Sequence, residues 1–148
     1  MKKLAIAAIA AAFATSAWAA PLCDKLGFAG LLASCNVGEE IELTLASGKP
    51  LHDGDGPIKL QSGAYYEMTI EADGSAELAV AGASFFRAIW MDEIVINKIE
   101  IRPMAIDSIE FDDAGEAEIG FVAIKPGRYE LGVPGARGES QKVQIHIQ

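Results

Sequence analysis

The sequence predicts an all-β protein, an antiparallel Greek-key β-sandwich. Short segments of the chain alternate apolar and polar residues with the two-residue period of a strand that buries one face. Turn residues separate these segments at short intervals, which is typical of antiparallel sandwiches. Tyr129 also follows the turn residue Gly127 by two positions, which is how a tyrosine corner begins in Greek-key sandwiches.

The centre of the expected sandwich is a hairpin between residues 117–123 and residues 129–133. Apolar and polar side chains alternate in both segments. Pro126 presets φ and Gly127 accepts a positive φ, so this pair supplies the turn. We expect Tyr129 to be largely buried, with its hydroxyl bonded to the backbone near the turn.

Further strands follow from the same alternation. They are expected at residues 41–45, 66–71, 76–81, 85–90, 94–101, 109–111 and 142–148. Asp73 and Gly74 predict a hairpin turn between the second and third of these segments. The apolar phase slips inside segment 94–101, which predicts a bulge near Asn97 and Lys98. Met68 is in phase with apolar neighbours and is expected in the core.

Residues 1–19 have the pattern of a signal peptide. Lys2 and Lys3 precede an apolar run over residues 4–13, and a small-x-small cleavage site ends at Ala19. The competing interpretation is an uncleaved anchor, but the apolar run is shorter than an ordinary membrane span. We therefore expect an exported chain, periplasmic or secreted, that begins at Ala20 and does not insert into the membrane.

The acidic composition narrows the choice of partners. The formal net charge is −9, and loss of the two lysines with the signal peptide brings it to −11. Such a surface repels nucleic-acid phosphates and anionic lipid headgroups. Cations and basic partner proteins, including a periplasmic partner, stay open, and so does the oligomeric state.

The two cysteines, Cys23 and Cys35, predict one disulfide in an exported chain. On one continuous helix their Cα atoms would lie about 18 Å apart, which is too far for a bond. The segment must therefore double back, at Gly27 or Gly30, and we expect the leucines at positions 31–32 to pack onto the sandwich. A redox or metal-binding pair is the alternative, but there is no C-x-x-C and no neighbouring histidine. Residues 20–39 are thus expected to form a clamped segment before a sandwich domain at 40–148.

Two stretches resemble known sequences. FVAIKPG followed by YELGVPGARGESQKVQIHIQ resembles the C-terminal hairpin of cupredoxins, and FFRAIWMDEIVI resembles the strand pair near their first histidine ligand. The combination is similar to small secreted bacterial proteins of cupredoxin-like type, over residues 40–148. The resemblance implies a cupredoxin-like sandwich and makes copper the cofactor to consider. Pro-Gly hairpins and tyrosine corners also occur in immunoglobulin-like domains, so that strand order stays open.

The residues at the positions aligned with blue-copper ligands do not predict a blue-copper centre. Such a site needs one thiolate, two imidazoles and a weak axial thioether. The residues aligned with the cysteine, the second histidine, the axial methionine and the first histidine are Leu131, Ala136, Ser140 or Gln141, and Asp92 or Glu93. None of them offers the expected ligand atom. We therefore expect no type 1 copper site.

Copper could still be held by exposed groups. Thioethers suit Cu(I), and imidazoles suit Cu(II). The candidate ligands are two groups of neighbours, Met91 with Asp92 and Glu93, and His52 with Asp53 and Asp55. By contrast, His146 is expected on a solvated strand face and Met104 in a loop.

The same acidic loop raises calcium as a second possible ion, because Asp53 and Asp55 place two hard oxygen ligands close together. The loop fails the EF-hand template, since Ile58 stands where glycine is needed and Ala64 where a bidentate glutamate is needed. A weaker site shared with the acidic turn at 112–113 is the remaining form of this hypothesis.

No catalytic constellation is visible. The sequence lacks G-x-S-x-G, H-E-x-x-H and phosphate-loop motifs, and neither histidine stands beside an obvious nucleophile. We expect a protein that is not an enzyme. Two hypotheses remain: a binding or accessory protein that handles copper at its surface without a blue-copper centre, or an immunoglobulin-like interaction module that binds a protein and no metal.

Overall fold

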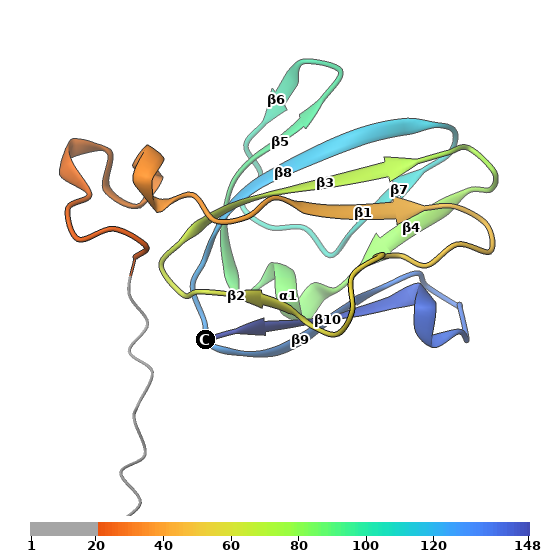
Figure 1. Cartoon of the computed structure of the whole chain (residues 1–148). Coiled ribbons are helices and arrows are strands. Elements are labelled where there is room, and N and C mark those ends of the chain that lie inside the picture. The colour runs from red at the N-terminus through yellow and green to blue at the C-terminus, as the bar shows by residue number, and fades with distance from the viewer. Residues whose placement is uncertain (1–20) are drawn as a thin grey trace, which may run out of the picture.

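The computed structural model describes residues 21–148, in which two five-stranded β-sheets pack face to face (Figure 1). The expected signal peptide and its cleavage site lie outside these residues. Among the described residues, no helix is long and apolar enough to cross a membrane. The expected β-sandwich is confirmed.

The strands divide equally between the two sheets. The first sheet contains, in spatial order, β1 (Ile41–Leu45), β3 (Tyr65–Ala72), β8 (Gly115–Ala123), β5 (Ile89–Ile96) and β6 (Ile99–Ile101). The second contains β2 (Ile58–Leu60), β10 (Lys142–Ile147), β9 (Gly127–Gly132), β4 (Leu78–Ala81) and β7 (Ser108–Phe111). The helical pieces are short: η1 (Gly27–Leu32), η2 (Ser34–Asn36), α1 (Ala83–Phe86) and η3 (Glu139–Gln141).

The sheets are mixed, so the expectation of a purely antiparallel sandwich is corrected in two places. β1 pairs with β3 in parallel, and β2 pairs with β10 in parallel. The cause is the path of the chain, because consecutive strands mostly alternate between the two sheets. A chain that leaves a sheet and returns beside the strand it left can run in the same direction again.

Both expected hairpins are wrong. β3 lies between β1 and β8, whereas β4 lies in the other sheet between β9 and β7. The turn at Asp73 and Gly74 therefore carries the chain from one sheet to the other. The turn at Pro126 and Gly127 does the same between β8 and β9. Alternation of side chains shows which face of a strand is buried, but it does not identify the hydrogen-bonded neighbour.

Two other segments also differ from expectation. The strand expected at 85–90 begins with a single helical turn, α1, which allows the adjacent Phe85 and Phe86 both to be buried. The expected bulge near Asn97 and Lys98 is a two-residue turn between β5 and β6, with φ values of 50° and 66°. Such left-handed pairs form tight hairpin turns. The bulge itself lies earlier in β5, between Met91 and Glu93.

The core lies between the sheets and follows the predicted alternation closely. Side chains expected to point inward from the first and last strands are buried, and Met68 is in the core as expected. Phe85 packs edge-on against Phe121, with ring centroids 5.6 Å apart. Met104, the expected loop residue, is fully exposed.

The hydrogen bond expected for the tyrosine corner is confirmed. The Tyr129 hydroxyl donates to the carbonyl oxygen of Lys125 at 2.8 Å. The ring is only partly buried, so the expectation that it is largely buried is wrong. It packs at the rim of the core, with its centroid 6.3 Å from that of Phe85.

The N-terminal segment doubles back as predicted. Cys23 and Cys35 form a disulfide with Cα atoms 5.8 Å apart, and Gly27 and Gly30 both take positive φ values, 61° and 59°. The two leucines at positions 31–32 are substantially exposed, so their expected packing onto the sandwich is wrong.

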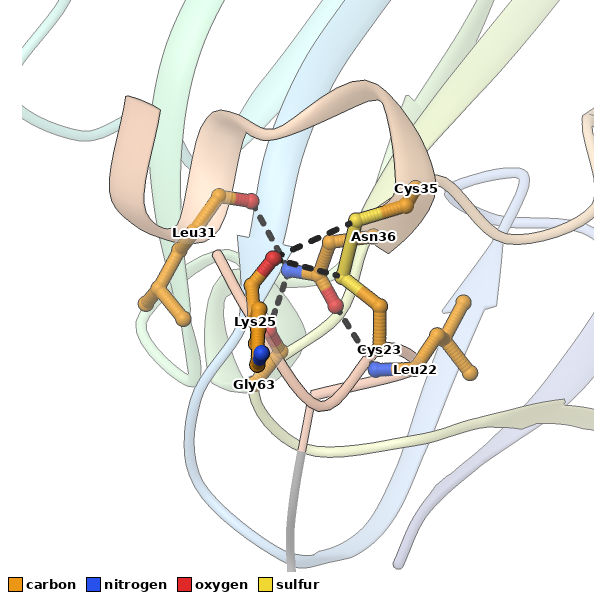
Figure 2. The surroundings of a disulfide bond; sticks show 7 residues. All are labelled: Leu22, Cys23, Lys25, Leu31, Cys35, Asn36 and Gly63. Carbon is orange, nitrogen blue, oxygen red and sulfur yellow. Dashed lines mark hydrogen bonds between the residues drawn. A yellow bond between two sulfur atoms is a disulfide. The ribbon is translucent and has the colours of Figure 1, made fainter. Parts of the chain in front are cut away.

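A buried asparagine anchors the segment instead (Figure 2). Asn36 has no exposed surface, and its Oδ1 accepts the Leu22 N–H at 2.8 Å. Its Nδ2 donates to the carbonyl oxygens of Leu31 and Gly63, each at 2.8 Å. Since Gly63 belongs to the turn before β3, one side chain ties the clamped segment to the sandwich.

Candidate functional site

The side chains of the first candidate copper site, Met91 with Asp92 and Glu93, do not come together. Met91 is only 6% exposed and belongs to the hydrophobic core, so its thioether is not available at the surface. Asp92 and Glu93 are instead held by the guanidinium of Arg102, each at 3.0 Å. The bulge in β5 separates the direction of the thioether from that of the carboxylates.

Two of the positions that the resemblance aligns with blue-copper ligands lie in different sheets. Leu131, at the cysteine position, is completely buried in β9. Asp92 and Glu93, at the first histidine position, lie on β5 in the other sheet and are bound to Arg102. The side chains at these positions supply core packing and an ion pair.

The second candidate group is brought together in part. His52 and Asp55 line one hollow of about 380 Å³, together with Glu39 and Glu40. Asp53 is exposed and does not line this hollow. Of the two aspartates near His52 in sequence, Asp55 therefore lines the same hollow and Asp53 does not.

On its other side, His52 lines a larger pocket of about 430 Å³ that also contains His146. These are the two histidines of the sequence, and they are 94 positions apart. His52 belongs to the connection between β1 and β2, whereas His146 lies on β10. The sequence does not predict this pocket, because alternation places His146 on a solvated strand face and nothing in the sequence indicates which loop covers that face.

Two hydrogen bonds to main-chain carbonyl oxygens hold this pocket in shape. The Leu51 N–H donates to the carbonyl oxygen of Ser140 at 2.7 Å, which fastens the β1–β2 connection to η3. The Gln141 side-chain amide donates to the carbonyl oxygen of Lys49 beside it. The β1–β2 connection and η3, which are distant in sequence, thereby form one wall of the pocket.

The His52 ring is oriented by a backbone partner. Its Nδ1 lies 3.2 Å from the carbonyl oxygen of Glu42, and because a carbonyl can only accept, the proton is on Nδ1. In the neutral imidazole, this hydrogen bond puts the lone pair on Nε2, the nitrogen that would then bind a metal. A side chain at position 54 would collide with Nε2, so Gly54 keeps the space beside this nitrogen open.

The outer face of the first sheet is strongly acidic. Glutamates from β1, β3 and β8 and the residue before β1 line a hollow of about 350 Å³: Glu40, Glu42, Glu71, Glu116 and Glu118. Partial burial raises the pKa of Glu118, and the neighbouring carboxylates of Glu67, Glu116 and Glu40 raise it further.

Tyr65 extends this acidic face toward β5. Burial, followed by the charges of Asp92 and three glutamates, raises its pKa to about 12. A side chain at position 120 would collide with the Tyr65 hydroxyl, so the phenol lies across Gly120. This face attracts cations and basic surfaces in general, and its geometry selects none of them.

The calcium hypothesis finds no support in the geometry. Within residues 21–148, one group of three acidic or ligating side chains is close enough to share an ion: Glu77, Glu110 and Asp112. Neither Asp53 nor Asp55 belongs to it, so the expected site shared with the turn at 112–113 does not form. A hydrogen bond with Glu110 and the charge of Asp112 raise the pKa of Glu77, as expected for crowded carboxylates.

The fold is similar to that of bacterial copper oxidases. A blue copper oxidase from Nitrosomonas europaea matches 75% of this chain with a TM-score of 0.54 and 12% identity. Multi-copper oxidases from Pseudomonas thermotolerans and Pseudomonas parafulva match 74% and 73% of it, with TM-scores of 0.54 and 0.52 and identities of 13% and 12%.

The similarity is confined to structure and to part of those proteins. The chain covers 44%, 29% and 30% of the three solved structures, so it spans less than half of their length. No protein-family model matches the sequence, and no curated protein matches it. At such identities the comparison establishes the fold alone. The chain has a cupredoxin-like fold, a β-sandwich that resembles the domains of multicopper oxidases.

Proposed function

We propose that this chain is an exported binding or accessory protein, periplasmic or secreted, that binds Cu(II) and has no blue-copper centre. The observation that carries the proposal is the pocket that His52 and His146 both line. The same proposal assigns the protein no catalytic activity, and it places copper at a surface site.

The donor set of the pocket suits Cu(II). Imidazole nitrogen is a good ligand for this ion, and the hydrogen bond from Nδ1 to Glu42 leaves Nε2 of His52 free to bind. Within residues 21–148, neither histidine belongs to a group of three or more ligating side chains that are close enough to share an ion. Water would complete the coordination, so the affinity is expected to be modest.

The absence of a thiolate ligand supports the part of the proposal that assigns the protein no blue-copper centre. Both cysteines of the sequence are joined in the disulfide, and Leu131 occupies the position of the cysteine ligand. A Cu(II)-loaded protein should therefore lack the intense visible band that a copper–thiolate bond produces.

Isothermal titration of the exported chain with Cu(II) tests the site. His52→Ala and His146→Ala should each weaken binding about 10-fold or more, since even outer-shell changes cost 10–100-fold. Gln144→Ala is the matched control, because Gln144 lines the same pocket on the same strand but is not an imidazole. Met91→Leu should also leave binding unchanged, because the thioether is buried.

Two results would reject copper binding at this pocket. One is no heat of binding at about 0.1 mM chain, a concentration at which micromolar affinities are readily seen. The other is binding that survives in the variant lacking both histidines. The first result would favour the alternative function, a protein-interaction module that binds no metal, whereas the second would show that copper binds elsewhere on the chain.

A further inference from the structure

The strand β6 is an open edge of the first sheet. Its one neighbour in the sheet is β5, and the β5–β6 hairpin extends beyond the other strands (Figure 1). Two of its residues, Ile99 and Ile101, are 63% and 45% exposed. Exposed, apolar edge strands are templates for pairing with another strand.

The hairpin geometry determines which backbone groups are free. Ile99 is paired with Ile96 across the two-residue turn, and Ile101 is paired with Ile94. The pair that flanks such a turn exchanges hydrogen bonds, and hydrogen-bonded pairs then alternate along the strands. The N–H and C=O of Glu100 therefore point away from β5, toward the open edge.

The side chains of β6 divide between two faces. Ile101 is opposite the buried Ile94, so it lies on the core side of the sheet, where the second sheet does not cover it. Glu100 and Arg102 lie on the other side, because they form an ion pair with each other at 3.3 Å. The edge thus has an apolar face and a charged face, on which Arg102 also contacts Asp92 and Glu93 of β5.

We propose that β6 pairs antiparallel with β6 of a second copy of this chain, about a two-fold axis at Ile101. In this register Glu100 of each copy is opposite Arg102 of the other, and the two Ile101 side chains meet on the apolar face. The outward-pointing backbone groups of Glu100 and Arg102 form the new hydrogen bonds. The first sheets of the two copies then form one continuous sheet.

Charge complementarity selects both the partner and the register. Opposite charges directly across a strand pair are favourable, whereas like charges are unfavourable. A two-fold axis at Glu100 would place the two glutamates opposite each other. An axis at Ile101 places a carboxylate of the second copy opposite each guanidinium, in addition to the three carboxylates of its own chain that Arg102 already contacts.

Another edge strand of the same sheet is less suited to this role. The outer edge of β1 is partly occupied, because the Thr44 N–H donates to the carbonyl oxygen of Leu51 at 2.9 Å. The pairing of β6 involves a short strand, whereas stable interfaces usually bury about 1,200–2,000 Å². The dimer is therefore expected to depend on protein concentration.

Sedimentation of the exported chain over a concentration series tests the proposal. We expect dimers to accumulate toward about 0.1 mM chain, and Glu100→Arg and Arg102→Glu each to shift the mass to that of a monomer. When these two variants are mixed, every charge in the register again meets its opposite, so a heterodimer should form. Glu110→Arg is the control, since it makes the same charge change on β7, an edge strand of the other sheet.

Three results would overturn the inference. The first is a wild-type chain that stays monomeric throughout the series, and the second is a single-charge variant that dimerises as well as the wild type. The third is a mixture of the two variants that gives no heterodimer. Glu100→Pro gives independent evidence, because it removes one outward N–H without touching a bond to β5, and it should weaken the dimer.

Discussion

Asn36→Ala should destabilise the folded protein by about 2–3 kcal/mol. The side chain is fully buried and makes three hydrogen bonds, to the Leu22 N–H and to the carbonyl oxygens of Leu31 and Gly63. A hydrogen bond contributes about 1 kcal/mol net, and three would give about 3 kcal/mol. The lower end of the range applies because the main-chain partners are only partly buried and can gain water.

Urea denaturation of the non-reduced protein measures this change. Asn36→Asp is the informative companion, because it keeps the oxygen that accepts from Leu22 but loses both donors. Its carboxylate would face two carbonyl oxygens, so it should be destabilised at least as much as the alanine variant. Ser34→Ala, an exposed neighbour, should change the free energy of unfolding by less than about 0.5 kcal/mol.

An unchanged midpoint for Asn36→Ala would refute this reasoning. It would mean that the clamped segment opens by itself, without the sandwich. Faster exchange of the Leu22 amide at an unchanged midpoint would identify that independent opening directly.

Two further predictions concern the sandwich. Tyr129→Phe should cost about 1 kcal/mol in urea denaturation, because only the bond to Lys125 is lost; no loss would show that the corner adds nothing to stability. Glu118→Gln should stabilise the protein near pH 7. The folded state raises the pKa of Glu118, so the wild type loses stability as pH rises above the ordinary glutamate value of about 4.5. Denaturation at about pH 4.5 and pH 7 should show a smaller loss in the variant, and equal losses would contradict the assignment.

Most of the fold prediction rests on the alternation of apolar and polar side chains. It identified the buried faces correctly, since burial depends on local period and Met68 could be placed from its neighbours alone. The disulfide was predictable because two cysteines have one partner each. Strand partners were not predictable, because the turns at 73–74 and 126–127 are equally compatible with a hairpin and with a crossing between sheets.

The candidate site was predictable only where it is local. His52 and Asp55 lie near each other in sequence and share a hollow. Met91 was grouped with Asp92 and Glu93 because they are neighbours in sequence, whereas the bulge after Met91 lets both carboxylates face outward while the thioether stays in the core. His146 was missed because its neighbour in the pocket depends on the parallel pairing of β2 with β10, which has no local signal.

That parallel pairing also affects when the chain can fold. β2 occupies the edge of its sheet, and β10 is its one strand neighbour, with Ile58 opposite Ile145. Residues 61–141 are synthesised between the two strands, which takes several seconds at roughly 5–20 residues per second. For that interval β2 has no partner, and contacts so distant in sequence form slowly even in the complete chain. A nascent chain halted before β10 should therefore keep an unpaired β2, bind chaperones and be cut by proteases within the connection that carries His52.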